Sequence, residues 1–536
     1  MKWKDYYDYA IIVLIFVIIF WSNLFSNLFL LDYVPGGNVL KSLAINNYAN
    51  LSIWHPLVFL FNLLHLQSVL FQLIILITML TSYYYIKKLS KHPLFFAFIF
   101  FFNPFIYSRI MVGQIGVILA FLLLPVFVHY ILDKDKSAIY KAALVAAIIG
   151  STQAHFFIIC IGLFFLSLFF FKHNRKPKPI IVFIILTIAI SAFWVQGLLQ
   201  RQILYDITSS HESFFAPKLS QNIPAIAKIM AMYGFWREPS YQVSYHILPL
   251  GLWYVLLSAL IILLLTGYFH KSSKQQHFYF ALWWIGILLA AGISHPYTQN
   301  LFNFLFSNIP FFNGFRDSHK FVALVALAYA FLIPEGVMYV GSKLKNKFVP
   351  ILVAVLIIIV LASPLINLNN QVHNTNYPDS YKKTADYLNN KEMKGNIIYL
   401  PWELYLTYNW TKTASPDGRI PVPINNIVKP IIIIGPEAWG STNDFQKNIT
   451  GCLTNKSIDC LASQNIEYVL KDRCAFYPET YAWINTTIAH EDACITIYHL
   501  NSRTITTSHR PRLRFFAGLI ISTIGIIAVI YLIKKP

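Results

Sequence analysis

Long apolar runs, each about 20 residues in length, recur along most of the chain and are separated by short polar stretches. A run of this length can cross the hydrocarbon part of a bilayer. Lipid offers no hydrogen bonds to the backbone, so a spanning segment must be a helix or part of a closed barrel. Barrel strands alternate apolar and polar residues, and these runs do not. The pattern therefore predicts an α-helical polytopic membrane protein.

The runs predict about twelve spanning helices. Two of them, 93–108 and 138–151, are short enough to be re-entrant or tilted. The apolar start of the chain continues to Leu31 without a small-residue cleavage site, so we expect a retained span rather than a signal peptide. The expected spans are 10–31, 66–86, 93–108, 114–132, 138–151, 153–171, 180–199, 248–269, 277–293, 320–341, 348–367 and 513–533.

One stretch, 368–512, has no spanning run and is rich in Asn, Thr, Asp and Lys. Within it, Tyr381–Lys391 predicts an amphipathic helix, and Asn396–Leu400, Val428–Gly435 and Glu467–Lys471 predict short strands. Helix and strand together predict a small α/β or α+β domain that is long enough to bury its own core.

The charge distribution gives the predicted helices a direction. Only 12% of the residues are charged, and 57% are hydrophobic. The formal net charge of +19 comes largely from Lys and Arg clusters in short loops between apolar runs, such as Lys87, Lys88 and Lys91. Such clusters mark cytoplasmic loops, so the charge orients the protein and indicates no nucleic-acid partner.

This orientation divides the chain into three expected parts. A membrane domain of about 11 helices covers 1–367, an extracytoplasmic soluble domain covers 368–512, and a C-terminal spanning helix lies in 513–536. Both termini are then cytoplasmic, in a multi-pass protein of the cell membrane. Arginines just before the last span depart from the charge rule, which long loops obey poorly.

Cysteine placement agrees with this sidedness. Four of the five cysteines, Cys452, Cys460, Cys474 and Cys494, fall in the soluble domain. An even number in a segment placed outside indicates two disulfides in an oxidising compartment. Pairing of Cys452 with Cys460 and of Cys474 with Cys494 is the simplest of three connectivities. A zinc site is the alternative, but no CxxC spacing supports it.

Glycosylation sequons point the same way. Asn409, Asn448, Asn455 and Asn485 each begin an Asn-x-Ser/Thr triplet in the soluble domain, and Asn50 begins another in the first outer loop. None of these lies on the expected cytoplasmic side.

Rare ionisable residues mark the outer membrane boundary, where charge is expensive. Asp32 is the one acid between Asp8 and Asp133, and the Pro-Gly-Gly turn that follows holds it near the boundary. Arg109 stands in the segment NPFIYSRIMVGQ and could bind a phosphate or extend to the lipid headgroups. By itself, Asp32 could equally be a helix-end acid that faces water.

A third polar cluster, NGFRDSHKF, precedes the span at 320–341. It contains Arg316, Asp317, His319 and Lys320. With Ser318, these make five polar or charged residues at the entrance of a span, which indicate a site or a phosphate clamp. The alternative is an internal Arg316–Asp317 pair with interfacial anchors.

Together, an acid at the end of the first span, the NPF…SR…GQ turn and the FRDxxKF segment resemble the GT-C class of membrane glycosyltransferases. The likeness is nearest to prokaryotic arabinofuranosyltransferase-like polytopic membrane proteins, and it covers most of the spanning region. The segments 381–402 and 464–471 also look similar to the outer domain of those proteins. The WWDYG-type motif of oligosaccharyltransferases is not found in this sequence.

The resemblance implies a hexosyl- or pentosyltransferase that uses a polyprenyl-phosphate-linked sugar as donor and a glycan or lipid-linked acceptor at the outer face. Asp32 would be the base that acts on the acceptor hydroxyl, and Arg109 and Arg316 would bind the donor phosphate. Asp317 would be a second acid, supported by His319 and Lys320. No cofactor is implied, although a divalent cation could be held if a second ligand converged on Asp32.

Two other functions fit a membrane protein of this shape. A lipid or solute transporter or flippase usually shows internal repeats and charged or broken helices at the midplane, and we find no obvious repeat. A non-catalytic glycan-binding protein could instead use Trp402, Trp410 or Trp439 of the soluble domain.

Overall fold

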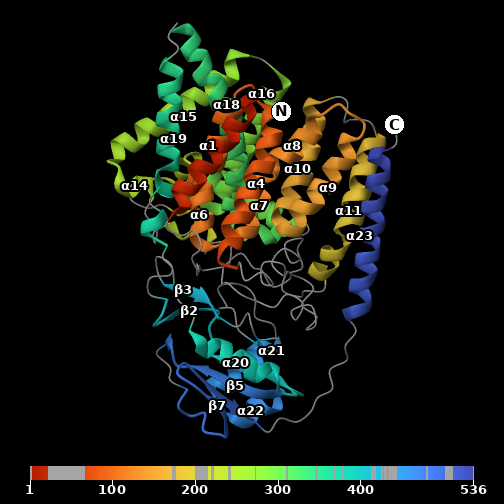
Figure 1. The fold of residues 1–536 in the computed structure, drawn as a ribbon, viewed down its shortest axis with the longest axis vertical. Helices are drawn as coiled ribbons and strands as arrows, with labels where there is room; N and C mark the ends of the chain where they lie inside the picture. Colours follow the sequence, from red (N-terminus) through yellow and green to blue (C-terminus); the bar gives the residue numbers. More distant parts are fainter. Residues whose placement is uncertain are drawn as a thin grey trace.

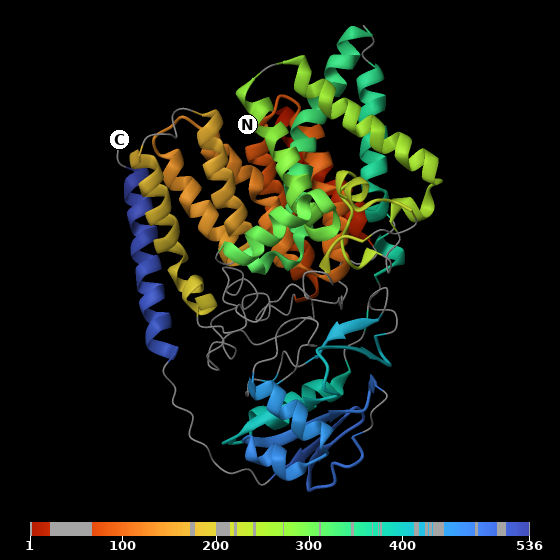
Figure 2. The same cartoon turned by 180° about the vertical axis from the view of Figure 1, so that it is seen from behind.

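The computed structural model consists of a large helical body and a small region that contains the strands (Figure 1). It describes residues 3–21, 67–171, 177–199, 215–218, 222–238, 243–271, 273–309, 312–344, 348–366, 368–372, 375, 378–411, 418–423, 427, 431–432, 444–477, 481–500 and 511–534. Both chain ends are marked at the end of the helical body that lies away from the strands (Figures 1 and 2). The multi-pass topology and the orientation of the termini, including which side is cytoplasmic, stay predictions.

The helical body is built from α-helices along most of its length. Their bounds are α1 Trp3–Phe20, α4 Gln67–Leu89, α5 Pro93–Phe101, α6 Pro104–Val112, α7 Ile115–Leu122, α8 Leu124–Leu132, α9 Ala138–Thr152, α10 Ala154–Phe170, α11 Pro177–Leu199, α13 Ala225–Met230, α14 Ser244–Ile247, α15 Leu250–His270, α16 Lys274–Ala291, α17 Pro296–Asn308, α18 Val322–Lys343, α19 Phe348–Ile366 and α23 Pro511–Lys534. Short 3-10 helices are η6 Gly292–Ser294, η7 Phe312–Arg316, η8 Ser318–Phe321 and η9 Leu368–Asn370.

Within the described ranges, seven helices are long and apolar enough to cross a membrane, or eight if one bent pair counts as a single span. The seven are Ile115–Leu132, Pro177–Val195, Leu250–His270, Lys274–Ser294, Ser318–Lys343, Phe348–Ile366 and Ala517–Lys534. Shorter apolar helices cover Tyr6–Phe20, Ala138–Thr152 and Ala154–Phe170. Helix α4 covers the predicted span 66–86, but three tyrosines and two lysines in its second half make it more polar. The membrane-type helical architecture is confirmed, whereas the number of about twelve spans is not.

The bent pair replaces the predicted single span 93–108. Helix α5 ends at Phe101, α6 begins at Pro104, and the two are bent by 40°. Pro104 has no N–H to donate back into α5, so the first helix cannot continue through it. Asn103 caps α6, because its side chain accepts a hydrogen bond from the N–H of Ile106. The break starts a new helix that carries Arg109.

Helix α18 is the central helix of the body, and 89% of its most apolar 18-residue stretch is buried. Its contact with α15 depends on two glycines. A Cβ at Gly267 would lie 2.0 Å from the carbonyl oxygen of Leu332, and one at Gly336 would lie 2.0 Å from that of Leu263. Small residues allow helix backbones to approach closely where hydrophobic burial cannot drive association in lipid. This packing holds the second half of α18 against α15, and Asp317 and its neighbours lie just before the other end of α18.

The strand-containing region holds two sheets. Its strands are β1 Asn396–Leu400, β2 Tyr405–Tyr408, β3 Arg419–Pro421, β4 Ile431–Ile432, β5 Ile466–Asp472, β6 Ala475–Phe476, β7 Ile488–Glu491 and β8 Ile495–His499, and its helices are α20 Asp379–Asn389, α21 Asp444–Thr454 and α22 Ile458–Ser463. The larger sheet has the order β4-β1-β5-β8-β7, with β4, β1 and β5 parallel and the other pairs antiparallel. The smaller sheet, β3-β2-β6, is antiparallel.

The side chains of β1 point alternately to the two faces of the larger sheet, and a hydrophobic core forms on each face. Ile397 and Tyr399 pack in a cluster with Leu388 of α20, whereas Ile398 and Leu400 pack with residues of α21 and α22. The sheet is therefore covered by helix on both faces, as a half-parallel sheet requires. The predicted helix at 381–391 and the strands at 396–400 and 467–471 are confirmed, with small shifts of their ends.

Some predictions fall outside the described residues. These include Asp32, the Asn50 sequon and Trp439. Of the predicted strand 428–435, only Ile431–Ile432 is described, as β4.

Candidate active site

Arg109 lies inside the protein rather than at its surface. The break before Pro104 turns α6 so that Arg109 is fully buried, with 0% of its surface exposed. A guanidinium keeps its charge inside a protein, so it must find partners there.

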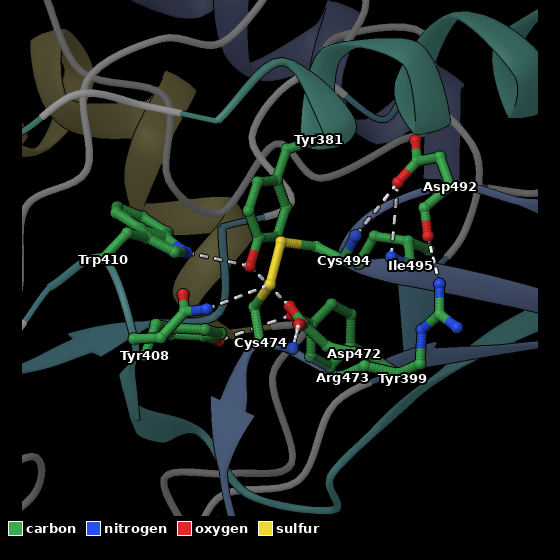
Figure 3. Close-up of a disulfide and its surroundings, with 11 residues drawn as sticks. Tyr381, Tyr399, Tyr408, Trp410, Asp472, Arg473, Cys474, Asp492, Cys494 and Ile495 are labelled. Carbon is green, nitrogen blue, oxygen red and sulfur yellow. Dashed lines mark hydrogen bonds between the residues drawn. A yellow bond between two sulfur atoms is a disulfide. The ribbon is translucent and has the colours of Figure 1, made fainter.

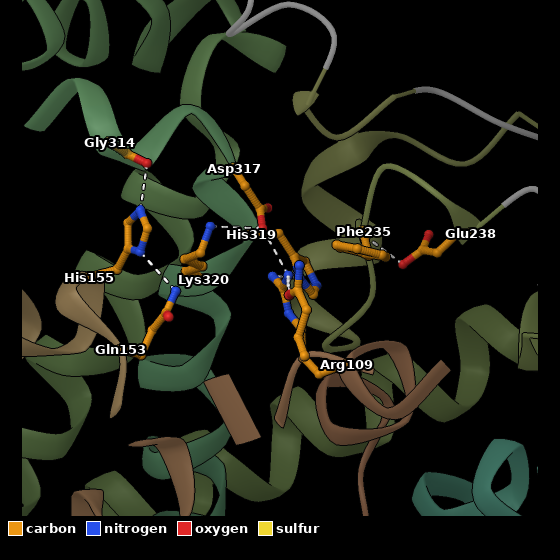
Figure 4. A network of polar contacts seen from close by, with 10 residues as sticks. Arg109, Gln153, His155, Phe235, Glu238, Gly314, Asp317, His319 and Lys320 are labelled. Atoms are coloured by element: carbon orange, nitrogen blue, oxygen red, sulfur yellow. Dashed lines mark hydrogen bonds and ion pairs between the residues drawn. The ribbon is translucent and has the colours of Figure 1, made fainter. Parts of the chain in front are cut away.

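Two partners of Arg109, Asp317 and His319, come from the predicted cluster before α18 (Figure 4), and a third, Gln114, follows α6. Its Nη1 donates to Asp317 Oδ2 at 2.8 Å and to Gln114 Oε1 at 2.6 Å. Its Nη2 lies 2.8 Å from His319 Nδ1. Lys320 Nζ donates to the same Asp317 Oδ2 at 3.1 Å. The structure thus brings together four of the residues predicted for the site, and we call Arg109, Asp317, His319 and Lys320 the buried charge cluster.

The hydrogen bonds fix the tautomer of His319. Arginine can only donate, so the Nδ1 that faces Arg109 Nη2 must accept, and the ring proton sits on Nε2. A ring that accepts at Nδ1 is neutral. The buried charge cluster therefore contains two cations, Arg109 and Lys320, and one carboxylate, Asp317.

The buried charge cluster also has polar atoms that lack hydrogen-bond partners within the described ranges. They are Arg109 Nε, Asp317 Oδ1 and His319 Nε2. Two of them are N–H donors and one is an acceptor. Buried polar groups are normally paired, so unpaired groups beside excess positive charge indicate a site for an anion with a nearby donor group.

Aromatic rings enclose the guanidinium and the imidazole. Arg109 Cζ lies 4.5 Å from the ring centroid of Phe235 and 5.3 Å from that of Phe105. The ring of His319 lies between the same two phenylalanines, at 5.6 and 5.5 Å. Cations are attracted to ring faces, and the attraction strengthens when water is excluded.

The loop that carries Phe235 is held by a buried acid. Glu238 accepts hydrogen bonds from the backbone N–H groups of Gly234 and Phe235, and it lies 3.9 Å from Lys228 Nζ. Gly234 has φ +106°, and a Cβ there would lie 3.7 Å from His319 Cδ2. Glycine adopts this backbone conformation without strain, whereas other residues rarely do.

Asp317 stays ionised in this setting. Burial alone would raise its pKa, but the charges of Arg109 and Lys320 outweigh burial and hold the pKa of Asp317 below its usual range. The alternative of an internal Arg316–Asp317 pair is not what forms, because Asp317 bonds to Arg109 and Lys320 instead.

Arg316 lies beside the buried charge cluster with a different environment. It is half-buried, and its guanidinium carbon lies 4.9 Å from the ring centroid of Phe215. Burial lowers the pKa of Arg316, and the nearby Asp317 and Tyr405 act against this lowering. Tyr405 belongs to β2, so Arg316 is at the end of the helical body that faces the strands.

One partly buried residue beside the cluster was not predicted from the sequence. His155, at the start of α10, places Nε2 2.6 Å from the carbonyl oxygen of Gly314 and Nδ1 2.9 Å from Gln153 Nε2. It therefore fixes the turn that precedes Arg316 (Figure 4). A single histidine between two apolar runs was the one signal in the sequence, and it resembles an ordinary buried histidine.

The described residues contain no group of three or more His, Cys, Asp or Glu side chains that could hold a metal ion. Asp32 is outside those residues, so the suggested role of a divalent cation stays untested.

In the strand-containing region, disulfides join Cys452 to Cys460 and Cys474 to Cys494. This is the connectivity that we named as the simplest. The second disulfide lies beside Asp472, which accepts hydrogen bonds from the hydroxyls of Tyr381 and Tyr399 (Figure 3).

The other residues predicted in this region lie as follows. Asn409, Asn448, Asn455 and Asn485 of the sequons are all exposed. Trp402 is 8% exposed and donates to Thr450, and Trp410 is partly buried and donates to Tyr381. Both tryptophans belong to the core of the region, which argues against their use as exposed glycan-binding platforms.

No family model and no curated protein matches the sequence. Solved structures of the arabinofuranosyltransferase AftD from Mycobacteria, determined by single-particle cryo-electron microscopy, share the fold. The first has a TM-score of 0.57 at 12% identity over 93% of this chain. Two structures of a variant of that enzyme give TM-scores of 0.58 and 0.55, each at 11% identity over 92% of this chain.

The chain spans only 40–41% of the length of those structures. These TM-scores confirm, at the level of the fold, the resemblance that the short motifs indicated. It is a resemblance to GT-C membrane glycosyltransferases of the arabinofuranosyltransferase-like kind.

Proposed function

We propose that this protein is a membrane glycosyltransferase that transfers a sugar from a polyprenyl-phosphate-linked donor to a glycan or lipid-linked acceptor on the extracytoplasmic face. The observation that supports the proposal most directly is the buried charge cluster. It combines excess positive charge with two unpaired N–H donors at the end of the helical body that faces the strands. A lipid phosphate carries the opposite charge and offers oxygen acceptors.

The donor phosphate is bound by two sets of groups in this proposal. Arg316, which is half-buried at the edge, makes the first contact with the phosphate. The buried charge cluster lies behind it, and Arg109 and His319 offer their unpaired Nε–H and Nε2–H. Asp317 keeps Arg109 and Lys320 in place, so that the positive charge is preorganised before the donor arrives.

Asp32 acts as the base in the proposed reaction. A sugar hydroxyl is a poor nucleophile, and a positioned carboxylate that takes its proton accelerates attack by about 10²–10⁴-fold. The acceptor oxygen bonds to the anomeric carbon, the bond from that carbon to the phosphate oxygen breaks, and the polyprenyl phosphate leaves with the electron pair. Cationic groups stabilise the leaving phosphate without proton transfer.

A panel of donors tests the proposal. The purified protein is reconstituted in proteoliposomes with radiolabelled polyprenyl-phosphate pentofuranoses and hexoses and an octyl disaccharide acceptor. We expect the acceptor to grow by one sugar with at least one donor. We also expect Asp32→Asn to lower the rate by at least about 10²-fold. Arg316→Ala should raise KM for the donor, and Arg316→Lys should restore part of the loss because it keeps the charge.

The control is Asp386→Asn, which removes an exposed acid from α20 and should leave transfer unchanged. Absence of transfer with every donor would overturn the proposal. Movement of the labelled donor across the bilayer without any acceptor would support a flippase instead. Full activity of a correctly folded Asp32→Asn variant would remove Asp32 from the mechanism.

A further inference from the structure

Helix α17 joins two candidate membrane spans but is too short to cross a membrane itself. The spans are Lys274–Ser294, which includes α16, and Ser318–Lys343, which includes α18. The 13 residues of α17 give a length of about 20 Å, whereas the hydrocarbon core of a bilayer is about 30 Å thick. Figure 2 shows the green segment that contains α17 at the end of the helical body that faces the strands. Helix α17 therefore lies at the membrane boundary where α16 ends and α18 begins.

The surface of α17 is divided into three sides. Thr298 and Phe302 are buried against the helical body. Tyr297, Leu301 and Phe304, which lie one helical turn apart, are 90%, 46% and 58% exposed. The exposed residues of the third side are polar, and they include Asn300, Asn303 and Ser307. Separate apolar and polar sides on an exposed helix are typical of a helix that lies in the plane of a membrane surface.

The lipid-facing residues of α16 lead up to the apolar side of α17. Trp284 and Leu288, in the last two turns of α16, are 45% and 42% exposed on a candidate span. The short helix η6 connects the two helices, and α17 packs against both η6 and α16. Tyr297 at the start of α17 is of a residue type that is enriched at membrane boundaries. Lipid is therefore the partner that fits the apolar side.

The buried side of α17 is joined to the segment that carries Arg316. Phe302 is 1% exposed, and its ring centroid lies 5.4 Å from that of Phe312. The ring centroid of Phe312 lies in turn 5.2 Å from that of Phe315, the residue before Arg316. Three aromatic rings thus connect α17 to the arginine that we propose as the first contact of the donor phosphate.

A second connection leads from α17 to Asp317. Thr298 Oγ1 donates to the carbonyl oxygen of Gly292 at 2.7 Å. A Cβ at Gly292 would lie 2.8 Å from Ser318 Oγ, so η6 and Ser318 are in close contact. Ser318, the residue after Asp317, donates from Oγ to the carbonyl oxygen of Ala290 at 2.9 Å. A change in the depth of α17 in the membrane would therefore move the segment that holds Arg316 and the buried charge cluster.

We propose that α17 binds the membrane surface and thereby holds Arg316 at the depth of the lipid phosphates. Tyr297, Leu301 and Phe304 insert among the lipids, and the polar side faces water. The inference rests on the proposed function, because a polyprenyl-phosphate donor carries its phosphate at the membrane surface. It adds the partner, a lipid surface, that positions the site relative to that phosphate.

Spin labelling of the full chain in vesicles of phosphatidylethanolamine and phosphatidylglycerol tests the placement of α17 without any substrate. Cys160→Ser removes the free thiol, and the other four cysteines are in disulfides. Leu301→Cys and Asn303→Cys then each carry a single nitroxide. We expect dissolved oxygen, which concentrates in lipid, to relax the label at position 301 more than a water-soluble nickel chelate does, and the reverse at position 303. Leu352→Cys, exposed on the span α19, is the lipid control, and Asp386→Cys on α20 is the water control.

Three results of this measurement would overturn the inference. The label at position 301 could respond like the label at position 386, which would place the apolar side in water. The labels at 301 and 303 could both respond like the label at 352, which would embed α17 rather than place it at the surface. Neither reagent could reach the label at 301, which would assign the apolar side to a contact with another copy of the chain.

Donor titrations test the connection between α17 and the site. The variant combines Leu301→Gln with Phe304→Gln, so that two apolar side chains lose their contact with lipid. We expect KM for a long-chain polyprenyl-phosphate donor to rise about tenfold. KM for a water-soluble short-chain donor should change less than about twofold, because the phosphate of that donor is not held at a fixed depth. Asn303→Gln on the polar side is the matched control and should leave both KM values unchanged.

An unchanged KM for the long-chain donor in the double variant would overturn the role of α17 in setting the depth of the site. An equal rise of both KM values would also overturn it, because the change would then be a general distortion of the site. If the wild-type protein transfers no sugar from any donor, the proposed function itself fails, whereas the spin labels still decide where α17 lies.

Discussion

The buried charge cluster makes a quantitative prediction about stability. Asp317 Oδ2 accepts from both Arg109 and Lys320, at 2.8 and 3.1 Å. Replacing Asp317 with Asn leaves two buried cations without an anionic partner. Breaking a buried ion pair by removing one partner costs about 3–5 kcal/mol. We therefore expect Asp317→Asn to lower the free energy of unfolding by about that amount.

A second substitution separates charge from packing. In the wild-type background, Lys320→Gln removes a cation from a shared carboxylate and should destabilise the protein. In the Asp317→Asn background, the same change removes one of two unpaired cations and should restore about 1–2 kcal/mol. The sign of the Lys320→Gln effect thus reverses with the identity of residue 317.

The free energy of unfolding is measured by SDS titration in dodecyl maltoside micelles, with tryptophan fluorescence as the readout. Asp386→Asn serves as the control, because this exposed position should change stability by less than about 0.5 kcal/mol. If Lys320→Gln destabilises both backgrounds equally, the two charges are not coupled. The account of Asp317 as the shared counter-ion would then be wrong.

Three further predictions follow from other parts of the molecule. Burial raises the pKa of Asp472 to about 6, from about 3.9 in the unfolded chain. The stability that this group contributes is therefore complete below pH 4 and is lost as the pH rises through 6, a change of about 3 kcal/mol. Hydrogen exchange of the β5 peptide, corrected for intrinsic rates, should report that slope, and Asp472→Asn should abolish it. Replacing both cysteines of the Cys474–Cys494 disulfide with Ser should destabilise the same peptide by about 3 kcal/mol, because the bond closes a loop with a sequence separation of 20. An unchanged rate of hydrogen exchange in that peptide would contradict this estimate. Gly336→Ala should lower the midpoint of thermal unfolding, because its Cβ would lie 2.0 Å from a carbonyl oxygen of α15, whereas Gly251→Ala, with nothing within 4 Å, should not.

The proposed function depends on the buried charge cluster of the helical body. The helical body supplies the cations that would hold a charged donor. The buried charge cluster is rigid because α18 is packed on most sides and because Glu238 holds the loop of Phe235. Preorganised charge of this kind needs no rearrangement when the leaving group develops its negative charge.

The sequence by itself determined the broad architecture. Apolar runs and Lys clusters are local features, and their physical meaning does not depend on distant contacts. The same holds for the amphipathic helix α20 and the strands β1 and β5, whose periodicities are visible in a few residues. Cys474 and Cys494 could be proposed as a pair because they stand near each other in the chain.

Only the tertiary structure decided what the polar residues do. Arg109 and Asp317 are 208 residues apart, and their ion pair depends on the break at Pro104 and on the packing of α18. From the sequence, Arg109 could equally bind a phosphate or extend to the headgroups. Neither hypothesis includes the buried carboxylate of Asp317 that Arg109 contacts. Local patterns report what a segment prefers, whereas a site is made by groups that long-range packing brings together.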